Sequence, residues 1–136
     1  MKGRKPKAFL DTNVWISAYV FTGNEKKIVE KAINGEFQAV VSDQVIDEFN
    51  RIMYKKFDYS KKLVLEAISE IIQISEMANF DVALNLKLKD KDDIAIVNAA
   101  MIHDCDYLIT GDKGILNLKQ VKRTKIVRPR EFLEIL

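Results

Sequence analysis

Four acids in this chain stand where an alternating α/β chain would gather carboxylates, and they are Asp11, Glu48, Asp93 and Asp112. Two of them directly follow short runs typical of strands, 8–10 and 107–111, and the other two border the apolar stretches 45–53 and 94–102. Carboxylates gathered from distant positions repel one another unless cations or protons balance them. A set of hard oxygen donors suits Mg²⁺ or Mn²⁺ better than zinc or copper. The acids therefore predict a divalent-metal site of the kind that hydrolyses phosphodiesters.

Each of these acids also has an ordinary structural explanation. Asp11 and Asp112 could be turn residues whose side chains bond to nearby backbone amides. Asp93 could stabilise the start of a helix, where acids interact favourably with free amides and with the helix dipole. Three acids at positions 90, 92 and 93 nonetheless exceed what capping requires. Asp93 is therefore the preferred metal ligand of this segment, and Asp92 is the second choice.

Helical phase separates Glu48 from its neighbour Asp47. At about 100° per residue, the apolar face of a helix over 45–53 centres near Val45 and Phe49. Asp47 then lies almost opposite that face, towards solvent, whereas Glu48 lies at its border. A cleft could reach Glu48 there, although an ordinary surface glutamate remains the alternative.

Strands and helices alternate along the chain. Apolar patterns predict strands over 7–11, 37–42, 107–110 and 125–127, and helices over 14–20, 25–34, 43–56, 60–77, 94–102 and 129–136. We expect Asn13 and Asn24 to cap the first two helices, and segment 82–89 to be a loop with a possible short strand. The alternation predicts an α/β fold, with a mostly parallel sheet and helices on both faces. Asp11 and Asp112 would then meet at the carboxyl ends of the strands, where such sheets bind ligands.

Composition indicates one domain, 1–136, with a basic N-terminal tail over 1–6. The hydrophobic content of 48% is enough for a real core. The longest uncharged apolar stretch, 14–21, is far shorter than the ~20 residues that cross a bilayer. No secretory signal is visible, and the single cysteine, Cys105, fits a reducing interior. We therefore expect a cytoplasmic protein with no membrane segment.

Positive charge is concentrated in two segments. The stretch 117–130 holds six lysines and arginines and no acid, and the N-terminal tail with Lys7 adds four more. Basic segments beside an acidic site suit a polyanion held against bound metal, although an ordinary solvated surface is an equal alternative for each segment alone. The cations that we expect to contact this polyanion are Lys113, Lys119, Lys122 and Arg123.

Taken in order, these motifs resemble those of PIN-domain ribonucleases, most of all the toxin components of bacterial and archaeal toxin–antitoxin pairs. The resemblance spans residues 9 to about 130. It rests on Phe-Leu-Asp11-Thr-Asn13-Val with Ser17 beyond, on Ser42 to Glu48, on Asp92-Asp93-Ile-Ala-Ile-Val-Asn-Ala-Ala, and on Tyr-Leu-Ile-Thr110-Gly-Asp112. Each motif is weak alone, but the ordered set is fairly specific.

The resemblance implies a three-layer α/β/α sandwich and an acidic pocket that binds one or two Mg²⁺ or Mn²⁺ ions and hydrolyses RNA. It assigns metal binding to the four acids, with Asp112 the least secure, and supporting hydrogen bonds to Asn13 and Thr110. A cognate antitoxin protein and a homodimer are the implied partners. Trp15, Tyr19 and Phe21 either pack in the core or form a dimer or antitoxin surface.

Other readings of the same residues remain open. The chain could be an RNA-processing nuclease outside a toxin system, or a module that binds RNA without cutting it. An aspartyl-phosphate protein is weakened because position 13 is Asn rather than Asp. The only histidine, His103, excludes a two-histidine acid–base mechanism and is expected, like Cys105, to be structural.

Overall fold

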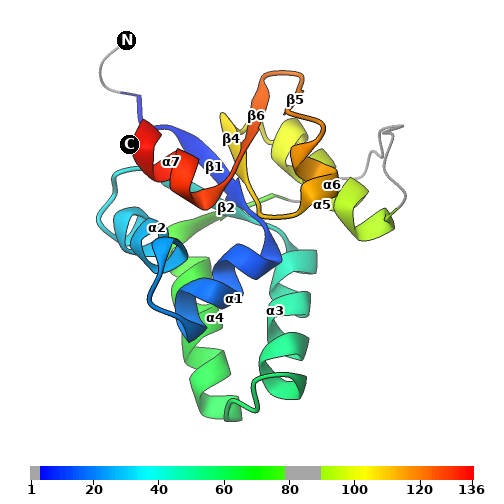
Figure 1. Ribbon diagram of the computed structural model, residues 1–136. Coiled ribbons are helices and arrows are strands. Elements are labelled where there is room, and N and C mark those ends of the chain that lie inside the picture. Colours follow the sequence, from blue (N-terminus) through cyan, green and yellow to red (C-terminus); the bar gives the residue numbers. More distant parts are fainter. Residues whose placement is uncertain (1–3, 79–89) are drawn as a thin grey trace.

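The computed structural model describes residues 4–78 and 90–136, which form a sheet between layers of helices (Figure 1). The strands are β1 (Lys7–Leu10), β2 (Gln38–Val41), β3 (Ser75–Met77), β4 (Tyr107–Ile109), β5 (Gln120–Val121) and β6 (Thr124–Val127). Their order in the sheet is β3-β2-β1-β4-β6-β5, and every pairing is parallel except that of β5 with β6. The predicted α/β fold with a mostly parallel sheet is confirmed.

The helices are α1 (Thr12–Val20), α2 (Asn24–Ile33), α3 (Asp43–Lys55), α4 (Lys61–Ile74), α5 (Lys91–Ile102), α6 (Lys113–Leu116) and α7 (Pro129–Ile135). Gly35 follows the end of α2 with a φ of 78°, a left-handed conformation that glycine adopts at low cost. The Ser42 and Ser60 side chains accept backbone N–H bonds and cap α3 and α4. None of the helices in the described residues is long and apolar enough to cross a membrane.

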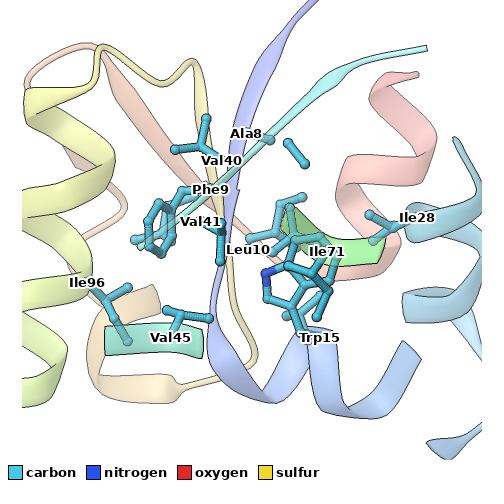
Figure 2. Close-up of a cluster of buried hydrophobic side chains, with 14 of the residues drawn as sticks. Ala8, Phe9, Leu10, Trp15, Ile28, Val40, Val41, Val45, Ile71 and Ile96 are labelled. Atoms are coloured by element: carbon cyan, nitrogen blue, oxygen red, sulfur yellow. The ribbon is translucent and has the colours of Figure 1, made fainter. Parts of the chain in front are cut away.

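The core lies on both faces of the central strand, because successive side chains of a strand point to opposite sides. Figure 2 shows Phe9 of β1 on the same side as Ile96 of α5, whereas Leu10 lies with Trp15 and Ile28 on the other side. All of these side chains are buried. Helices of both layers are thereby fixed to β1, the strand that ends at Asp11.

Several predicted boundaries were wrong, each for a local reason. Asp11, not Asn13, caps α1, since its side chain accepts the Thr12 N–H. Gly23 occupies the cap of α2, one residue before the predicted Asn24, and makes no side-chain bond there. Helix α4 ends at Ile74, because residues 75–77 pair with β2 as the edge strand β3. The one-turn helix α6 and the two-residue strand β5 were not predicted, and segment 82–89 lies outside the described residues.

Some of the basic residues form salt bridges with a carboxylate at the amino end of β4. Asp106 is 18% exposed, and its Oδ1 accepts bonds from Arg4 at 2.6 Å and Arg123 at 2.5 Å. Its Oδ2 accepts the Lys7 N–H at 2.8 Å. One carboxylate therefore fastens the N-terminal segment and the β5–β6 hairpin to the middle of the sheet.

We predict that Asp106→Ala lowers the free energy of unfolding by about 1.5–3 kcal/mol, the usual worth of hydrogen bonds to a charged group. The reason is that a backbone N–H and two guanidinium groups lose one shared acceptor. Denaturant unfolding followed by circular dichroism would measure the change. Asp47→Ala, at an exposed acid of α3, is the control, and an equal loss in both variants would contradict the special role of Asp106.

Candidate active site

The site forms where two central parallel strands end. Leu10 of β1 lies opposite Ile109 of β4, so the residues that follow each strand meet at one edge of the sheet. Asp11 follows β1 and caps α1, whereas Asp112 follows β4 and caps α6. These two acids line a cavity of about 580 Å³. This is the crevice in which open α/β sheets bind ligands.

Asp11 is held in one orientation by hydrogen bonds to both of its oxygens. Its Oδ1 accepts the backbone N–H of Thr12 at 2.7 Å, and its Oδ2 accepts the hydroxyl of Thr110, also at 2.7 Å. The Thr110 hydroxyl in turn accepts the backbone N–H of Asp112 at 3.0 Å. With only 7% of its surface exposed, Asp11 is a buried carboxylate whose position is linked through Thr110 to the loop after β4.

Asp112 has a structural role as well as a place at the cavity. Its Oδ2 accepts the backbone N–H of Ile115 at 2.9 Å and so caps α6, as expected for a turn residue. The turn alternative is thus observed for this acid. Capping occupies one carboxylate oxygen and does not exclude a second role for the other.

Glu48 and Asp93 approach from α3 and α5. Glu48 is half-buried whereas its neighbour Asp47 is exposed, in agreement with the helical phase, and Glu48 Oε1 accepts the Thr12 hydroxyl at 3.4 Å. On α5 the cap is Asp90, which accepts the Asp92 N–H at 2.8 Å. Capping therefore does not account for Asp93, which is half-buried in the first turn of the helix.

The acids influence one another's ionisation. Burial, and then the charge of Asp112, raise the pKa of Asp93 to about 6. Burial also raises the pKa of Asp11, opposed by its hydrogen bonds from Thr110 and Thr12 and reinforced by Asp112. The pKa of Glu48 is raised by burial first, then by Asp92 and Asp11. The carboxylates from four separate elements therefore share one region of negative potential.

The donor chemistry of this region fits a hard divalent cation, because every candidate ligand is a carboxylate oxygen. The raised pKa values reflect burial first and repulsion between the acids second, and a cation would favour the charged form of each acid against both. The side chains do not yet converge: in residues 4–78 and 90–136, no three acids, histidines or cysteines are placed to hold one ion together. The residue types fit the metal, and a bound ion would have to draw the carboxylates closer to one another.

The raised pKa values predict a specific dependence of stability on pH in metal-free buffer. Asp93 binds its proton more tightly in the folded state, so its contribution to stability is present below its ordinary pKa of 3.8 and is lost as the pH rises through about 6. We expect Asp93→Asn to remove this loss. The melting temperature of the variant minus that of the wild type should therefore increase between pH 4 and pH 7.5. Thermal melts in EDTA would measure the difference, and parallel curves for the two proteins would contradict it.

Not all of the predicted cations lie at the acidic cavity. Asn13 is exposed in the first turn of α1 and lines the cavity, as does Lys113 of α6. Lys122 and Arg123 instead lie in the turn between β5 and β6, which precedes the amino end of β6 and so lies at the opposite edge of the sheet. Lys119 precedes β5, and its carbonyl accepts the Ile126 N–H in the middle of β6. Lys122 and Arg123 therefore lie away from the acids, and their binding of RNA stays a prediction.

Sequence reasoning missed two residues at the site. The sequence places Thr12 beside Asp11, where it could orient that carboxylate, but does not reveal that the Thr12 hydroxyl donates to Glu48 of α3. Glu25, in the first turn of α2, lines the same cavity as Asp11. Nothing in the sequence around Glu25 distinguishes it from a favourable acid at a helix N-terminus, so only the packing of α2 against α1 reveals its place.

The fold and the site define an α/β protein with an acidic crevice at the carboxyl ends of a parallel sheet. A family profile described as PIN domain matches residues 7–114, and the chain therefore belongs to the PIN domain family. No curated protein sequence matches it. Among solved structures, the fold is similar to a chain in the crystal structure of VapBC2 from Rickettsia felis bound to a DNA fragment from their promoter, with a TM-score of 0.63 and 15% identity over 90% of this chain and 98% of that one.

Proposed function

We propose that this protein is a metal-dependent endoribonuclease in which Asp11, Glu48, Asp93 and Asp112 hold one or two Mg²⁺ or Mn²⁺ ions, with Asp92 as a second-choice ligand. The observation that carries this proposal is the buried Asp11 carboxylate, fixed by Thr110 and Thr12 within the field of the other acids. A carboxylate kept buried among like charges is costly unless a cation balances it. Membership in the PIN domain family, whose members are typically nucleases, supports the same conclusion.

The roles of the residues follow from their places. When bound, the ion lowers the pKa of water to supply hydroxide near neutral pH and offsets negative charge on the phosphate. Asp11 is the rigid ligand, because both of its oxygens are already oriented. Thr110 and Thr12 position Asp11 and Glu48, while Lys113, at the rim of the cavity, is placed to attract the phosphate backbone.

The cellular setting that we propose is a toxin–antitoxin pair, with a cognate antitoxin protein and a homodimer of this chain as partners in the cytoplasm. The fold is similar to a chain of a VapBC complex, which supports this setting. An RNA-processing nuclease with the same site is the second candidate, and it would act without an inhibitory partner. Co-expression with the product of the adjacent gene would separate the two, because only a toxin would be inhibited by it.

Cleavage of single-stranded and structured RNA in Mn²⁺, Mg²⁺ or EDTA tests the proposed chemistry. Wild-type protein and Asp93→Asn protein, purified identically, would be compared. We expect RNA cleavage only with metal and only by the wild type. The melting temperature of the wild type should also be higher in millimolar Mn²⁺ than in EDTA. RNA binding without cutting by either protein would favour the non-catalytic module instead.

A further inference from the structure

A second hollow adjoins the acidic cavity and has the opposite charge. It has a volume of about 530 Å³ and lies between α1 and the end of α3. It shares Asn13 and Ser17 with the acidic cavity, so the two hollows meet along α1. Its distinctive lining consists of three cations and two aromatic side chains, which we call the basic groove: Arg51, Lys55, Lys56, Phe21 and Phe57.

The cations of the basic groove continue the helical face that presents Glu48. Arg51 and Lys55 follow Glu48 by three and seven residues, so all three lie on one side of α3. With a rise of 1.5 Å per residue, they stand about 4.5 and about 10 Å from Glu48 along the helix axis. A chain of phosphates that leaves the acids along α3 would therefore meet one positive charge and then another.

These cations are available to a ligand. Arg51, Lys55 and Lys56 are exposed, and within residues 4–78 and 90–136 none of them forms a salt bridge. This contrasts with Arg123, which is paired with Asp106. Arg51 does lower the pKa of Glu48 through its charge, but cations that are concentrated in a concave surface and held in no salt bridge attract polyanions strongly.

The aromatic side chains of the groove provide a surface for a base. Phe21 is 57% exposed, which is unusual for a ring of its size. It meets Phe57 edge to face, with ring centroids 6.4 Å apart and planes at 84°, and Lys56 Nζ lies 5.8 Å from the Phe57 centroid. Phe21 thus contacts Phe57 while more than half of its own surface stays exposed, and exposed aromatic rings of this kind are the surfaces on which proteins stack unpaired bases.

We propose that the basic groove binds the single-stranded RNA flanking the scissile bond, with Arg51 and Lys55 on successive phosphates and Phe21 stacked on a base. This role deepens the proposed ribonuclease function and rests on it, because the strand is aligned by its passage through the acidic cavity. Single-stranded RNA is favoured over an acidic protein segment because the cations lie in line with the acids and share one helical face with Glu48. The same geometry disfavours a duplex, whose stacked bases could not reach Phe21.

The first test compares two charge-reversed double variants. One carries both Arg51→Glu and Lys55→Glu, and its matched control carries both Lys61→Glu and Lys62→Glu on α4. Both carry the same change in net charge at exposed positions. We expect only the first to raise KM for a single-stranded RNA, by about tenfold or more, and to reduce the salt dependence of binding by a slope of about 1.4, the value for two phosphate contacts on a single strand.

A second pair isolates the stacking. Phe21→Ala should weaken binding of the same RNA by about five- to hundredfold, whereas Leu65→Ala, at a leucine 53% exposed on α4, should leave it unchanged. Fluorescence anisotropy in EDTA measures binding for every variant, whether or not the protein cuts RNA. Equal RNA affinities across both pairs would overturn the proposal that the basic groove binds RNA. Binding of an acidic partner protein, lost in the charge-reversed variant while RNA affinity is unchanged, would instead assign the groove to that partner. Absence of cleavage by the wild type, with the binding differences intact, would overturn only the nuclease.

Discussion

Asp11→Asn is expected to abolish RNA cleavage while leaving the fold intact or slightly more stable. A bound metal contributes several kcal/mol of charge stabilisation to phosphodiester hydrolysis, and each 1.36 kcal/mol corresponds to a factor of ten in rate. Loss of the best-oriented ligand should therefore reduce kcat/KM by about a thousandfold or more. Cleavage of a fluorescent RNA in Mn²⁺ would measure it.

Stability should respond in the opposite direction, and this separates a ligand from a merely structural acid. Burial raises the pKa of Asp11, which means that folding disfavours its charge. The asparagine is neutral and can still accept the Thr12 N–H, so in EDTA its melting temperature should equal or exceed that of the wild type. If Asp11 served only to cap α1, the substitution would leave RNA cleavage unchanged, because asparagine caps a helix about as well as aspartate does.

The control for this variant is Asp47→Asn, which changes an exposed acid beside Glu48. It should leave both cleavage and melting temperature unchanged. If Asp11→Asn retained more than a tenth of the wild-type rate after identical purification, then the activity would belong to a contaminant or to another site. Added Mn²⁺ should raise the melting temperature of the wild type and of Asp47→Asn, but not that of Asp11→Asn.

The parts of the site that could be predicted are those that depend on periodicity. The 3.6-residue pattern of α3 placed Glu48 at the border of the apolar face and Asp47 in solvent, and the structure agrees. The alternation of strands and helices likewise predicts that Asp11 and Asp112 lie at one edge of the sheet, and the register of β1 with β4 agrees. Both inferences use regular geometry, which a sequence carries directly.

The parts that could not be predicted depend on contacts between distant segments. Asp11 and Asn13 are equally good capping types, and only the turn after β1 decides that Asp11 takes the role. Residues 75–77 carry no helix-breaking signal, and they leave α4 because β2 offers a free edge for pairing. The pairing of Arg123 with Asp106, seventeen residues earlier, likewise follows from the packing of β4 beside the β5–β6 turn and not from any local pattern.

The second large effect that we predict concerns the core beneath the site. Phe9 is fully buried in the central strand β1, two residues before Asp11, on the side of the sheet covered by α5 (Figure 2). Phe9→Ala should lower the free energy of unfolding by about 3–5 kcal/mol, because the lost burial is joined by the cost of the cavity left behind. Since domains of this size are stable by only about 5–15 kcal/mol, this is a large share of the total.

Phe21→Ala is the matched control for this substitution, because it removes the same ring from a position that is 57% exposed. We expect it to change stability by no more than about 0.5 kcal/mol while it weakens RNA binding. Phe9→Ala should thus lower stability and leave binding by the folded protein unchanged, whereas Phe21→Ala should do the reverse. Urea unfolding of both variants would measure the free energy of unfolding. Fluorescence anisotropy in EDTA, at a temperature where both variants remain folded, would measure their affinity for RNA. Equal destabilisation by the two substitutions would mean that Phe21 is part of the core, and the basic groove would then lose its stacking surface.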